Sequence, residues 1–256
     1  MELPVNRFKQ ALKEGRQQWG VWQTFGGPDM TELLAAAGYD WVLIDGEHGA
    51  FDVPEVRPCL QVVAGYPACS AVVRVCELNT ALIKRHLDQG AQTLMVPMIN
   101  SAEEARAAVS AMRFAPEGVR GYNSATRAGR YGAIAEYGAK AKDELCLIVQ
   151  IETRAALEAL EEIATVEGVD AVFIGPADLA ADLGYPGNLA APEVQAAVEG
   201  AIARLKALGV PSGIVTVDET LLERSIATGT RFTALGIDAV MMMQASHGLL
   251  SRFRDV

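Results

Sequence analysis

The stretch WVLIDGEHG, residues 41–49, opens with four apolar residues and ends in charged ones. An apolar run too short for a helix and bounded by polar residues and glycine is typical of a strand buried on both faces. Asp45, Glu47 and His48 follow it directly. Charged groups at the end of a buried strand lose hydration, which is costly unless they pair with other groups or bind a ligand. Each alone fits a structural role, as a cap, a surface acid or a hydrogen-bonded histidine, but other strand ends in the chain repeat the arrangement.

Strands and helices alternate along the whole chain. Apolar runs bounded by turn residues predict eight strands, at 20–25, 41–44, 68–75, 92–98, 145–151, 170–174, 212–215 and 232–235. Helical patterns separate these strands. Among them are one that follows residues 116–132 and ends at about 142, one at 153–164, one at 192–208 and a last helix from 239 to about 254. Eight units over 256 residues predict a single (β/α)8 TIM barrel domain, 1–256, rather than an open doubly wound sheet. The missing GxGxxG after the first strand further weakens a dinucleotide-binding interpretation.

Composition limits the classes of partner. The formal net charge is -10 and 50% of the residues are hydrophobic, which argues for a globular protein and against binding to nucleic acid or an anionic membrane. No apolar stretch is long enough to span a bilayer, and the first ten residues lack a signal core, so a cytoplasmic protein is expected. The four cysteines lack CxxC spacing and are expected to be free thiols, mostly buried.

Two carboxylates follow apolar strands in the second half of the chain. Glu152 and Asp178 could each be a helix N-terminal acid, but together they predict a hard-cation site for Mg²⁺ or Mn²⁺ with open positions. Asp178 belongs to a GPAD turn, made by Gly175, Pro176, Ala177 and Asp178. The free amides of the short helix that starts there would suit a carboxylate.

The remaining candidates are a cation and a base. Arg74 lies in the apolar run VVRVC, so it needs an anionic partner, either a structural aspartate or a substrate oxygen. His48 with Asp45 forms a candidate general base, the carboxylate fixing the imidazole tautomer and raising its basicity. His86 and His247 lie in predicted helices and are expected at the surface or at an interface.

Four motifs, DWVLIDGEHG, LDQGAQTLMVPM, VQIET and GVDAVFIGPADLAADLG, resemble in order and spacing those of the metal-dependent class II pyruvate aldolases of the HpcH/HpaI family. Members of that family include 4-hydroxy-2-oxoheptanedioate and 2-dehydro-3-deoxyglucarate aldolases. The resemblance covers nearly the whole chain and implies a TIM barrel of the phosphoenolpyruvate/pyruvate type. It also implies that Glu152 and Asp178 hold a divalent metal, Mg²⁺, Mn²⁺ or also Co²⁺, which a 2-oxo acid such as pyruvate or hydroxypyruvate chelates.

The resemblance implies roles for the other residues too. Arg74 would stabilise the enolate oxygen, and His48, oriented by Asp45, would move protons. The substrate would meet Gln150, with Glu47 supporting the site from behind, and its carboxylate would be held by the amides around Gly175 to Asp178. No lysine lies at these strand ends, which argues against a Schiff-base mechanism.

The resemblance further implies a homohexamer in which Asp88 lies at a subunit interface that helps to close the site. The last helix, with Leu249, Leu250 and Phe253, would be exchanged between subunits; the alternative is that it packs on its own barrel. The irregular loop PEGVRGYNSATRAGRYG, residues 116–132, and the end of the seventh strand at Val215 are expected to face the aldehyde.

The leading hypothesis is therefore a lyase that reversibly cleaves 4-hydroxy-2-oxo acids to pyruvate or hydroxypyruvate and an aldehyde, through an enolate stabilised by the metal. Two alternatives use the same enolate: decarboxylation of oxaloacetate and cleavage of a malyl-type thioester. A third is a non-catalytic barrel that binds a 2-oxo acid. No basic patch for the adenine phosphates of coenzyme A is evident, which weakens the thioester alternative.

Overall fold

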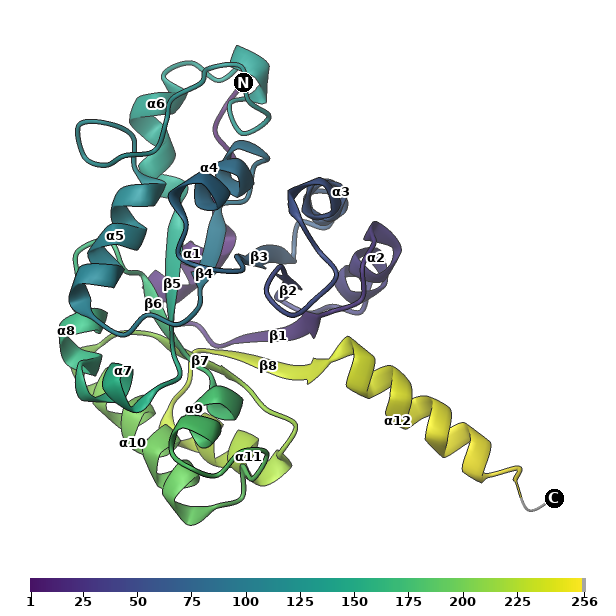
Figure 1. The fold of residues 1–256 in the computed structure, drawn as a ribbon. Helices are drawn as coiled ribbons and strands as arrows, with labels where there is room; N and C mark the ends of the chain where they lie inside the picture. The colour runs from purple at the N-terminus through teal and green to yellow at the C-terminus, as the bar shows by residue number, and fades with distance from the viewer. Residues whose placement is uncertain (255–256) are drawn as a thin grey trace.

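The computed structural model describes residues 1–254 of the chain as one closed barrel of eight parallel strands, as the alternating pattern predicts (Figure 1). The strands are β1 (Gln18–Gln23), β2 (Trp41–Asp45), β3 (Ser70–Arg74), β4 (Thr93–Val96), β5 (Cys146–Ile151), β6 (Ala171–Ile174), β7 (Ser212–Val215) and β8 (Phe232–Ile237). Each strand pairs with the next in the chain, and β8 pairs with β1 to close the barrel. The fold class predicted from the sequence is confirmed.

Helices surround the barrel. They are α1 (Arg7–Lys13), α2 (Pro28–Ala36), α3 (Val53–Val63), α4 (Thr80–Asp88), α5 (Ala102–Met112), α6 (Tyr137–Lys140), α7 (Arg154–Glu158), α8 (Leu160–Ala164), α9 (Pro176–Asp182), α10 (Pro192–Leu208), α11 (Glu219–Thr228) and α12 (Asp238–Ser251). Two 3-10 turns, η1 (Arg130–Gly132) and η2 (Ala141–Glu144), flank α6. None of the helices in residues 1–254 has the length and apolar character needed to cross a membrane.

Side chains alternate between the barrel interior and the layer beneath the helices. The interior cluster contains large side chains from both ends of the chain, among them Trp22, Trp41, Phe173 and Phe232. Gly20 makes room for Trp41, because a Cβ at that position would lie 2.0 Å from the indole ring. Helix α1 closes the amino-terminal end of the barrel, with Phe8 stacked edge-on against Trp41 and Phe232. The opposite, carboxyl-terminal end is left for polar groups.

Three predicted elements differ from the structure. The first strand begins at Gln18, two residues before the predicted start, because its pairing with β8 begins there. The predicted helix 153–164 is two short helices, since Ala159 leaves the helical region at φ -94° and ψ 14°. The helix expected after the irregular loop is reduced to α6, with η2 following.

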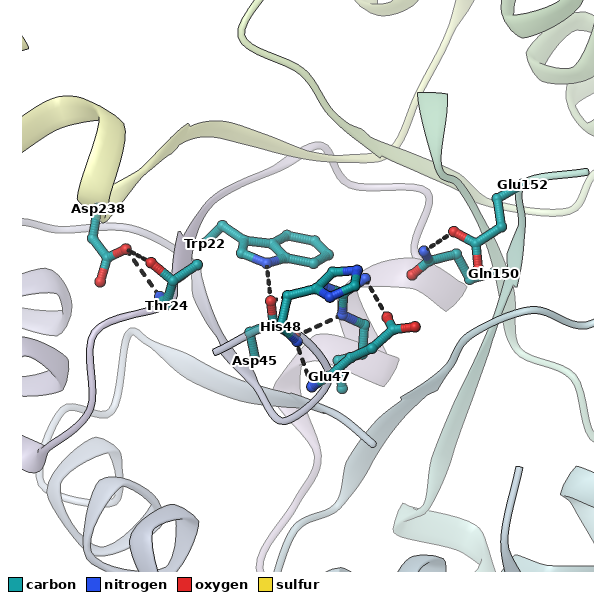
Figure 2. Close-up of polar contacts among 9 residues, drawn as sticks. Trp22, Thr24, Asp45, Glu47, His48, Gln150, Glu152 and Asp238 are labelled. Atoms are coloured by element: carbon teal, nitrogen blue, oxygen red, sulfur yellow. Dashed lines mark hydrogen bonds and ion pairs between the residues drawn. The ribbon is translucent and has the colours of Figure 1, made fainter. Parts of the chain in front are cut away.

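Helix α12 projects away from the barrel (Figure 1). Its apolar side chains are exposed, namely Met241, Met242, Met243, Leu249, Leu250 and Phe253. Packing of these side chains on their own barrel, the alternative considered from the sequence, is therefore wrong. Buried Asp238 anchors the start of the helix by accepting hydrogen bonds from Thr24 N at 2.9 Å, Thr24 Oγ1 at 2.7 Å and Phe25 N at 3.0 Å (Figure 2).

Candidate active site

Strand alternation brings the predicted polar residues to the carboxyl-terminal end of the barrel. Interior side chains Leu43, Val72, Ile148 and Phe173 are followed two positions later by Asp45, Arg74, Gln150 and Gly175. Side chains two apart on a strand point to the same face. Glu152 comes two positions after Gln150 and continues this face beyond β5. The predicted convergence of these strand ends is what the structure shows, in the position where TIM barrels carry their active sites.

Asp45 and Arg74 form the centre of this group. They are direct neighbours in the register of β2 and β3. Arg74 Nε donates to Asp45 Oδ1 at 2.8 Å and Nη2 to Oδ2 at 2.7 Å, while the indole Nε1 of Trp22 donates to Oδ2 at 3.0 Å (Figure 2). The backbone amides of Glu47 and His48 also donate to Asp45 Oδ1, at 3.0 and 3.3 Å. This carboxylate is therefore a structural anchor with five donors.

The pKa of Asp45 reflects these contacts. Its burial alone would raise the pKa, but the hydrogen bonds and charge of Arg74, followed by the bonds from Trp22 and from Glu47, outweigh burial and hold the pKa below its ordinary value. Asp45 is thus a permanent anion at neutral pH. The buried guanidinium that the sequence left without an assigned partner has this aspartate as its partner.

Arg74 has a second carboxylate partner and keeps unused donors. Its Nη1 lies 2.6 Å from Glu47 Oε2, and its guanidinium lies over the Trp22 ring, 4.8 Å from the centroid. Nε and Nη2 each donate one N–H to Asp45, whereas Nη1 makes an ion pair with Glu47 without hydrogen-bond geometry. N–H groups of Nη1 and Nη2 therefore remain as donors at the carboxyl-terminal end of β3.

Glu152 is the most constrained acid of the site. It is 1% exposed, accepts a hydrogen bond from Met98 N at 2.7 Å on Oε1, and accepts one from the Gln150 side-chain amide on Oε2. Burial raises its pKa, and the negative charge of Asp178 adds to the increase. Met98 adopts the left-handed conformation with φ 56°, which is costly for a residue other than glycine and is held here by the surrounding structure.

Gly175 and Asp178 adjoin this acid. A Cβ at Gly175 would lie 2.5 Å from Glu152 Oε2, so only glycine fits beside the carboxylate. The structure narrows the prediction that amides around Gly175 to Asp178 hold a carboxylate. The amide of Gly175 donates to Ile151 O at 3.0 Å in the barrel ladder, and Pro176 has no N–H. The amides of Ala177 and Asp178, in the first turn of α9, are the remaining donors.

The residues fit a divalent cation by charge and by donor type. Four carboxylates, of Asp45, Glu47, Glu152 and Asp178, lie at this end of the barrel with one guanidinium, which contacts two of them. Burial raises the pKa of Glu47 as well as that of Glu152, so the uncompensated negative charge is costly without a cation. The side-chain oxygen of Gln150 is buried without a hydrogen-bond partner. Within residues 1–254 no three His, Cys, Asp or Glu side chains are grouped as a complete ligand set, so water or substrate oxygens would have to complete the coordination.

The predicted orientation of His48 by Asp45 is wrong. Asp45 accepts a hydrogen bond from the backbone amide of His48, whereas no side-chain bond to the imidazole is present in the described part of the chain. The imidazole is exposed and acts electrostatically on Glu47, whose pKa it lowers. His48 therefore lies at the rim of the site as a group open to solvent, because the two oxygens of Asp45 are already occupied by Arg74 and Trp22.

Val215 and Asp88, two further residues predicted for the site, lie at opposite ends of the barrel. Val215 ends β7 and packs against the interior cluster at the barrel mouth, as expected. Asp88 ends α4, and α4 returns the chain to the amino-terminal end of β4, opposite to Glu152. Its carboxylate pairs with Arg120 Nη2 at 2.7 Å. Within one chain, Asp88 is therefore not part of the site.

The histidines outside the site differ from each other. His86 was expected at the surface or an interface, but it is 4% exposed, because it faces inward from α4, and burial lowers its pKa to about 4. His247 is exposed on α12, as expected. Of the four cysteines, Cys59, Cys69 and Cys146 are buried and Cys76 is exposed, and all four are free.

Two residues of the site were not predicted from the sequence. Trp22 holds Asp45 and stacks on Arg74, and Met98 supplies a backbone donor to Glu152. Trp22 is an inward residue near the end of β1, so reading that strand end as the others were read would have found it. Met98 acts through its backbone conformation, which its apolar side chain does not indicate.

Comparison with known proteins identifies the family of the chain. The family model described as HpcH/HpaI aldolase/citrate lyase matches residues 18–245. A pyruvate aldolase of Rhizobium etli is 54% identical over 253 residues, 99% of each chain, and a hydroxypyruvate/pyruvate aldolase of Sagittula stellata is 52% identical over 96% of this chain and 97% of the relative. A solved structure of a HpcH/HpaI aldolase/citrate lyase family protein from Burkholderia cenocepacia superposes with a TM-score of 0.93 at 35% identity, covering 98% of this chain and all of that one. The chain belongs to the HpcH/HpaI aldolase/citrate lyase family.

Proposed function

We propose that the chain is a metal-dependent class II aldolase that reversibly cleaves 4-hydroxy-2-oxo acids to pyruvate or hydroxypyruvate and an aldehyde. The observation that carries the proposal is that one barrel mouth holds both an acid and a fixed cation. The acid is buried Glu152, whose pKa is raised, and the cation is Arg74, whose guanidinium is held by two other carboxylates. The two curated relatives described above are named for pyruvate and for hydroxypyruvate and pyruvate.

Glu152 and Asp178 would hold the divalent metal, Mg²⁺, Mn²⁺ or Co²⁺, which when bound supplies Lewis-acid polarisation of the 2-oxo group. The donors from Met98 and Gln150 keep the Glu152 carboxylate in one orientation, so the ligand is preorganised. The amides of Ala177 and Asp178 would bind the substrate carboxylate, and the buried side-chain oxygen of Gln150 is free to accept a bond from a substrate hydroxyl.

Arg74 would stabilise the charge that develops on the keto oxygen as a proton leaves the methyl group or the carbon–carbon bond breaks. Its remaining N–H groups provide the donors, and Asp45, Glu47 and Trp22 hold it still, so little reorganisation is needed during the reaction. His48 would accept and return the proton at the rim. Its imidazole is exposed to solvent at the barrel mouth, and the Glu47 carboxylate lies close enough to interact with it electrostatically.

We also propose assembly into a homohexamer in which α12 is exchanged between subunits. The exposed apolar residues of α12 need a cover, and Asp88 can approach a barrel mouth only if a neighbouring copy brings it there. Light scattering after gel filtration measures the mass of the assembly, and a monomer at micromolar concentration would contradict this part.

The four free cysteines fit a reducing compartment, and we propose that the protein is cytoplasmic.

The function is tested by exchange of the pyruvate methyl protons in D₂O, followed by NMR, with added Mg²⁺ or Mn²⁺ and then with EDTA. Exchange that requires metal is expected, because the metal stabilises the enolate. The test can be run without identifying the aldehyde, since the enolate forms from the 2-oxo acid alone. Hydroxypyruvate is run in parallel as the second donor. Failure of both donors with every divalent metal tried would overturn the proposal.

A further inference from the structure

A cavity of about 570 Å³ lies at the amino-terminal end of the barrel, away from the candidate active site. Its floor includes Ser70 at the start of β3 and Thr93 at the start of β4, whereas Arg74 ends β3 at the other side. The cavity and the active site are therefore separated by the length of a strand. The first residues of the chain and the loop before α6 form the roof, and they lie side by side (Figure 1), with the Met1 amino group donating to Ala133 O at 3.0 Å.

The charge of this cavity is opposite to that of the protein. Arg7, Arg127 and Arg130 line it, and Glu2 is the single acid among the lining residues, although the chain has a net charge of -10. Within residues 1–254 none of these three arginines lies within ion-pair distance of a carboxylate. Arg74 and Arg120, which unlike these three are buried, do have such partners.

The hydrogen bonds of these arginines go to uncharged backbone groups, so no carboxylate balances their positive charges. Arg7 and Arg127 each donate to a backbone carbonyl, of Pro67 and Gln89 respectively. Arg130 makes no side-chain hydrogen bond in the described chain. Arg127 is half-buried, and its pKa is lowered first by burial and then by the like charge of Arg130. Arg7 and Arg130 are exposed, so the cost of an unpaired charge falls on half-buried Arg127, for which an anion in the cavity would be a stabilising partner.

The backbone that places Arg130 is strained as well. Arg130 and Tyr131 are consecutive residues with φ 51° and 56°, in the left-handed region that residues other than glycine avoid. Each such residue is energetically unfavourable, and such conformations are concentrated at functional sites. The fold thus accepts both strain and like-charge repulsion to keep Arg130 at the roof of the cavity, near Arg127.

We propose that this cavity binds a small organic molecule with two negative charges, a dicarboxylate or a phosphate monoester. Arginines bind both groups through paired N–H donors. The opposite wall of the cavity is apolar and would contact the carbon skeleton; it is formed by Leu60, Val63, Leu87 and Leu145. A volume of about 570 Å³ is in the range of cavities that enclose a metabolite.

Isothermal titration of the full-length protein with succinate and with glycerol 3-phosphate tests the proposal. Excess pyruvate and Mg²⁺ are present throughout, so that the active site is occupied. Arg127→Gln and Arg130→Gln are each expected to weaken binding about tenfold or more, from the loss of one charged hydrogen bond. Arg130→Gln is the cleaner variant, because Arg127 also holds Gln89 O. Arg106→Gln, at an exposed position on α5 outside the cavity, removes the same charge and should leave the affinity unchanged.

Binding of succinate would assign the site to dicarboxylates, and binding of glycerol 3-phosphate would assign it to phosphate monoesters; either supports the proposal. It is overturned if neither probe binds at millimolar concentration. It is also overturned if Arg130→Gln and Arg106→Gln bind equally well. The same holds if a probe binds only in a parallel titration without pyruvate and Mg²⁺, which would place the anion in the active site. Because the readout is binding with the active site blocked, its failure is distinct from failure of the proposed aldolase activity.

Discussion

Arg74 meets both oxygens of the Asp45 carboxylate, at 2.8 Å from Nε and 2.7 Å from Nη2, across neighbouring positions of β2 and β3. This bidentate pair is nearly inaccessible to solvent, and the Trp22 indole and the Glu47 carboxylate complete the surroundings of the guanidinium. A buried pair of this kind contributes little net stability compared with an apolar substitute, yet losing one partner is costly. Its benefit is the fixed position of a cation at the barrel mouth.

Replacement Arg74→Lys should therefore lower the rate of metal-dependent pyruvate proton exchange by about 100-fold or more. An ammonium keeps the charge but cannot bridge both Asp45 oxygens while it donates to a substrate. NMR exchange rates at saturating pyruvate give the effect. Arg154→Lys, an exposed arginine at the start of α7, is the matched control and should exchange at the wild-type rate. An unchanged rate in Arg74→Lys would remove Arg74 from the reaction.

Glu152→Gln should weaken Mn²⁺ binding by more than about 100-fold, since losing an outer partner of a ligand already costs 10 to 100-fold. Glutamine preserves the side-chain shape and can still accept the hydrogen bond from Met98 N, so the barrel is expected to fold. Titration calorimetry or the paramagnetic resonance of free Mn²⁺ gives the affinity. Glu158→Gln, an exposed acid at the end of α7, should bind as the wild type does. Wild-type affinity in Glu152→Gln would show that the metal is held elsewhere.

The same carboxylate predicts how stability depends on pH without metal. The folded pKa of Glu152 is raised above 4.5, chiefly by burial, so between the unfolded and folded values the folded state holds a proton that the unfolded state has lost. Stability should thus fall as pH rises above 4.5 and through the folded pKa. Asp45 has the opposite sign, but its window lies below 3.8. Urea unfolding should show a smaller decrease in Glu152→Gln and in the protein with added Mg²⁺; an equal decrease in all three would be inconsistent with this account.

Asp238 is expected to fix the direction of α12. Asp238→Ala removes an acceptor of bonds from Thr24 N, Thr24 Oγ1 and Phe25 N, so the free energy of unfolding should fall by about 2–4 kcal/mol, as charged hydrogen bonds are lost. Thr24→Val removes only the hydroxyl bond and should cost about 1 kcal/mol. Light scattering should show a smaller assembly for Asp238→Ala but not for Thr24→Val. If both variants form assemblies of equal mass, Asp238 is not needed for assembly.

The barrel and the positions of its site residues could be predicted from the sequence because both depend on local patterns. Apolar runs alternate with helical periods, and parallel strands place their carboxyl ends together, so Arg74, Gln150 and Glu152 were expected at one mouth. Partner choice could not be predicted in this way. Asp45 is three residues from His48, and sequence proximity suggested that pair. In the barrel, Asp45 instead faces the neighbouring strand and binds Arg74, because strand register decides which side chains meet.

Other features depend on contacts between distant segments. Met98 donates to Glu152 through a left-handed backbone conformation, which local propensity disfavours and which only the packed structure maintains. The arginine-lined cavity joins the first residues of the chain, the ends of α3 and α4 and the loop 116–132, so no single stretch of sequence indicates it. The burial of His86 likewise depends on which face of α4 meets α3.

His86 gives a further prediction about acid sensitivity. The folded pKa is about 4, lowered chiefly by burial, and the unfolded value is 6.5, so between them the unfolded state binds the proton. Stability is therefore complete above pH 6.5 and is lost as pH falls toward 4, by about 2 kcal/mol between pH 7 and pH 5. His86→Met, which fills a similar volume without a titrating group, should lose correspondingly less stability over this range in urea unfolding. His247→Gln changes an exposed histidine and should behave as the wild type. If His86→Met and the wild type lose the same stability, protonation of His86 is not the cause of the acid sensitivity, and other buried groups must account for it.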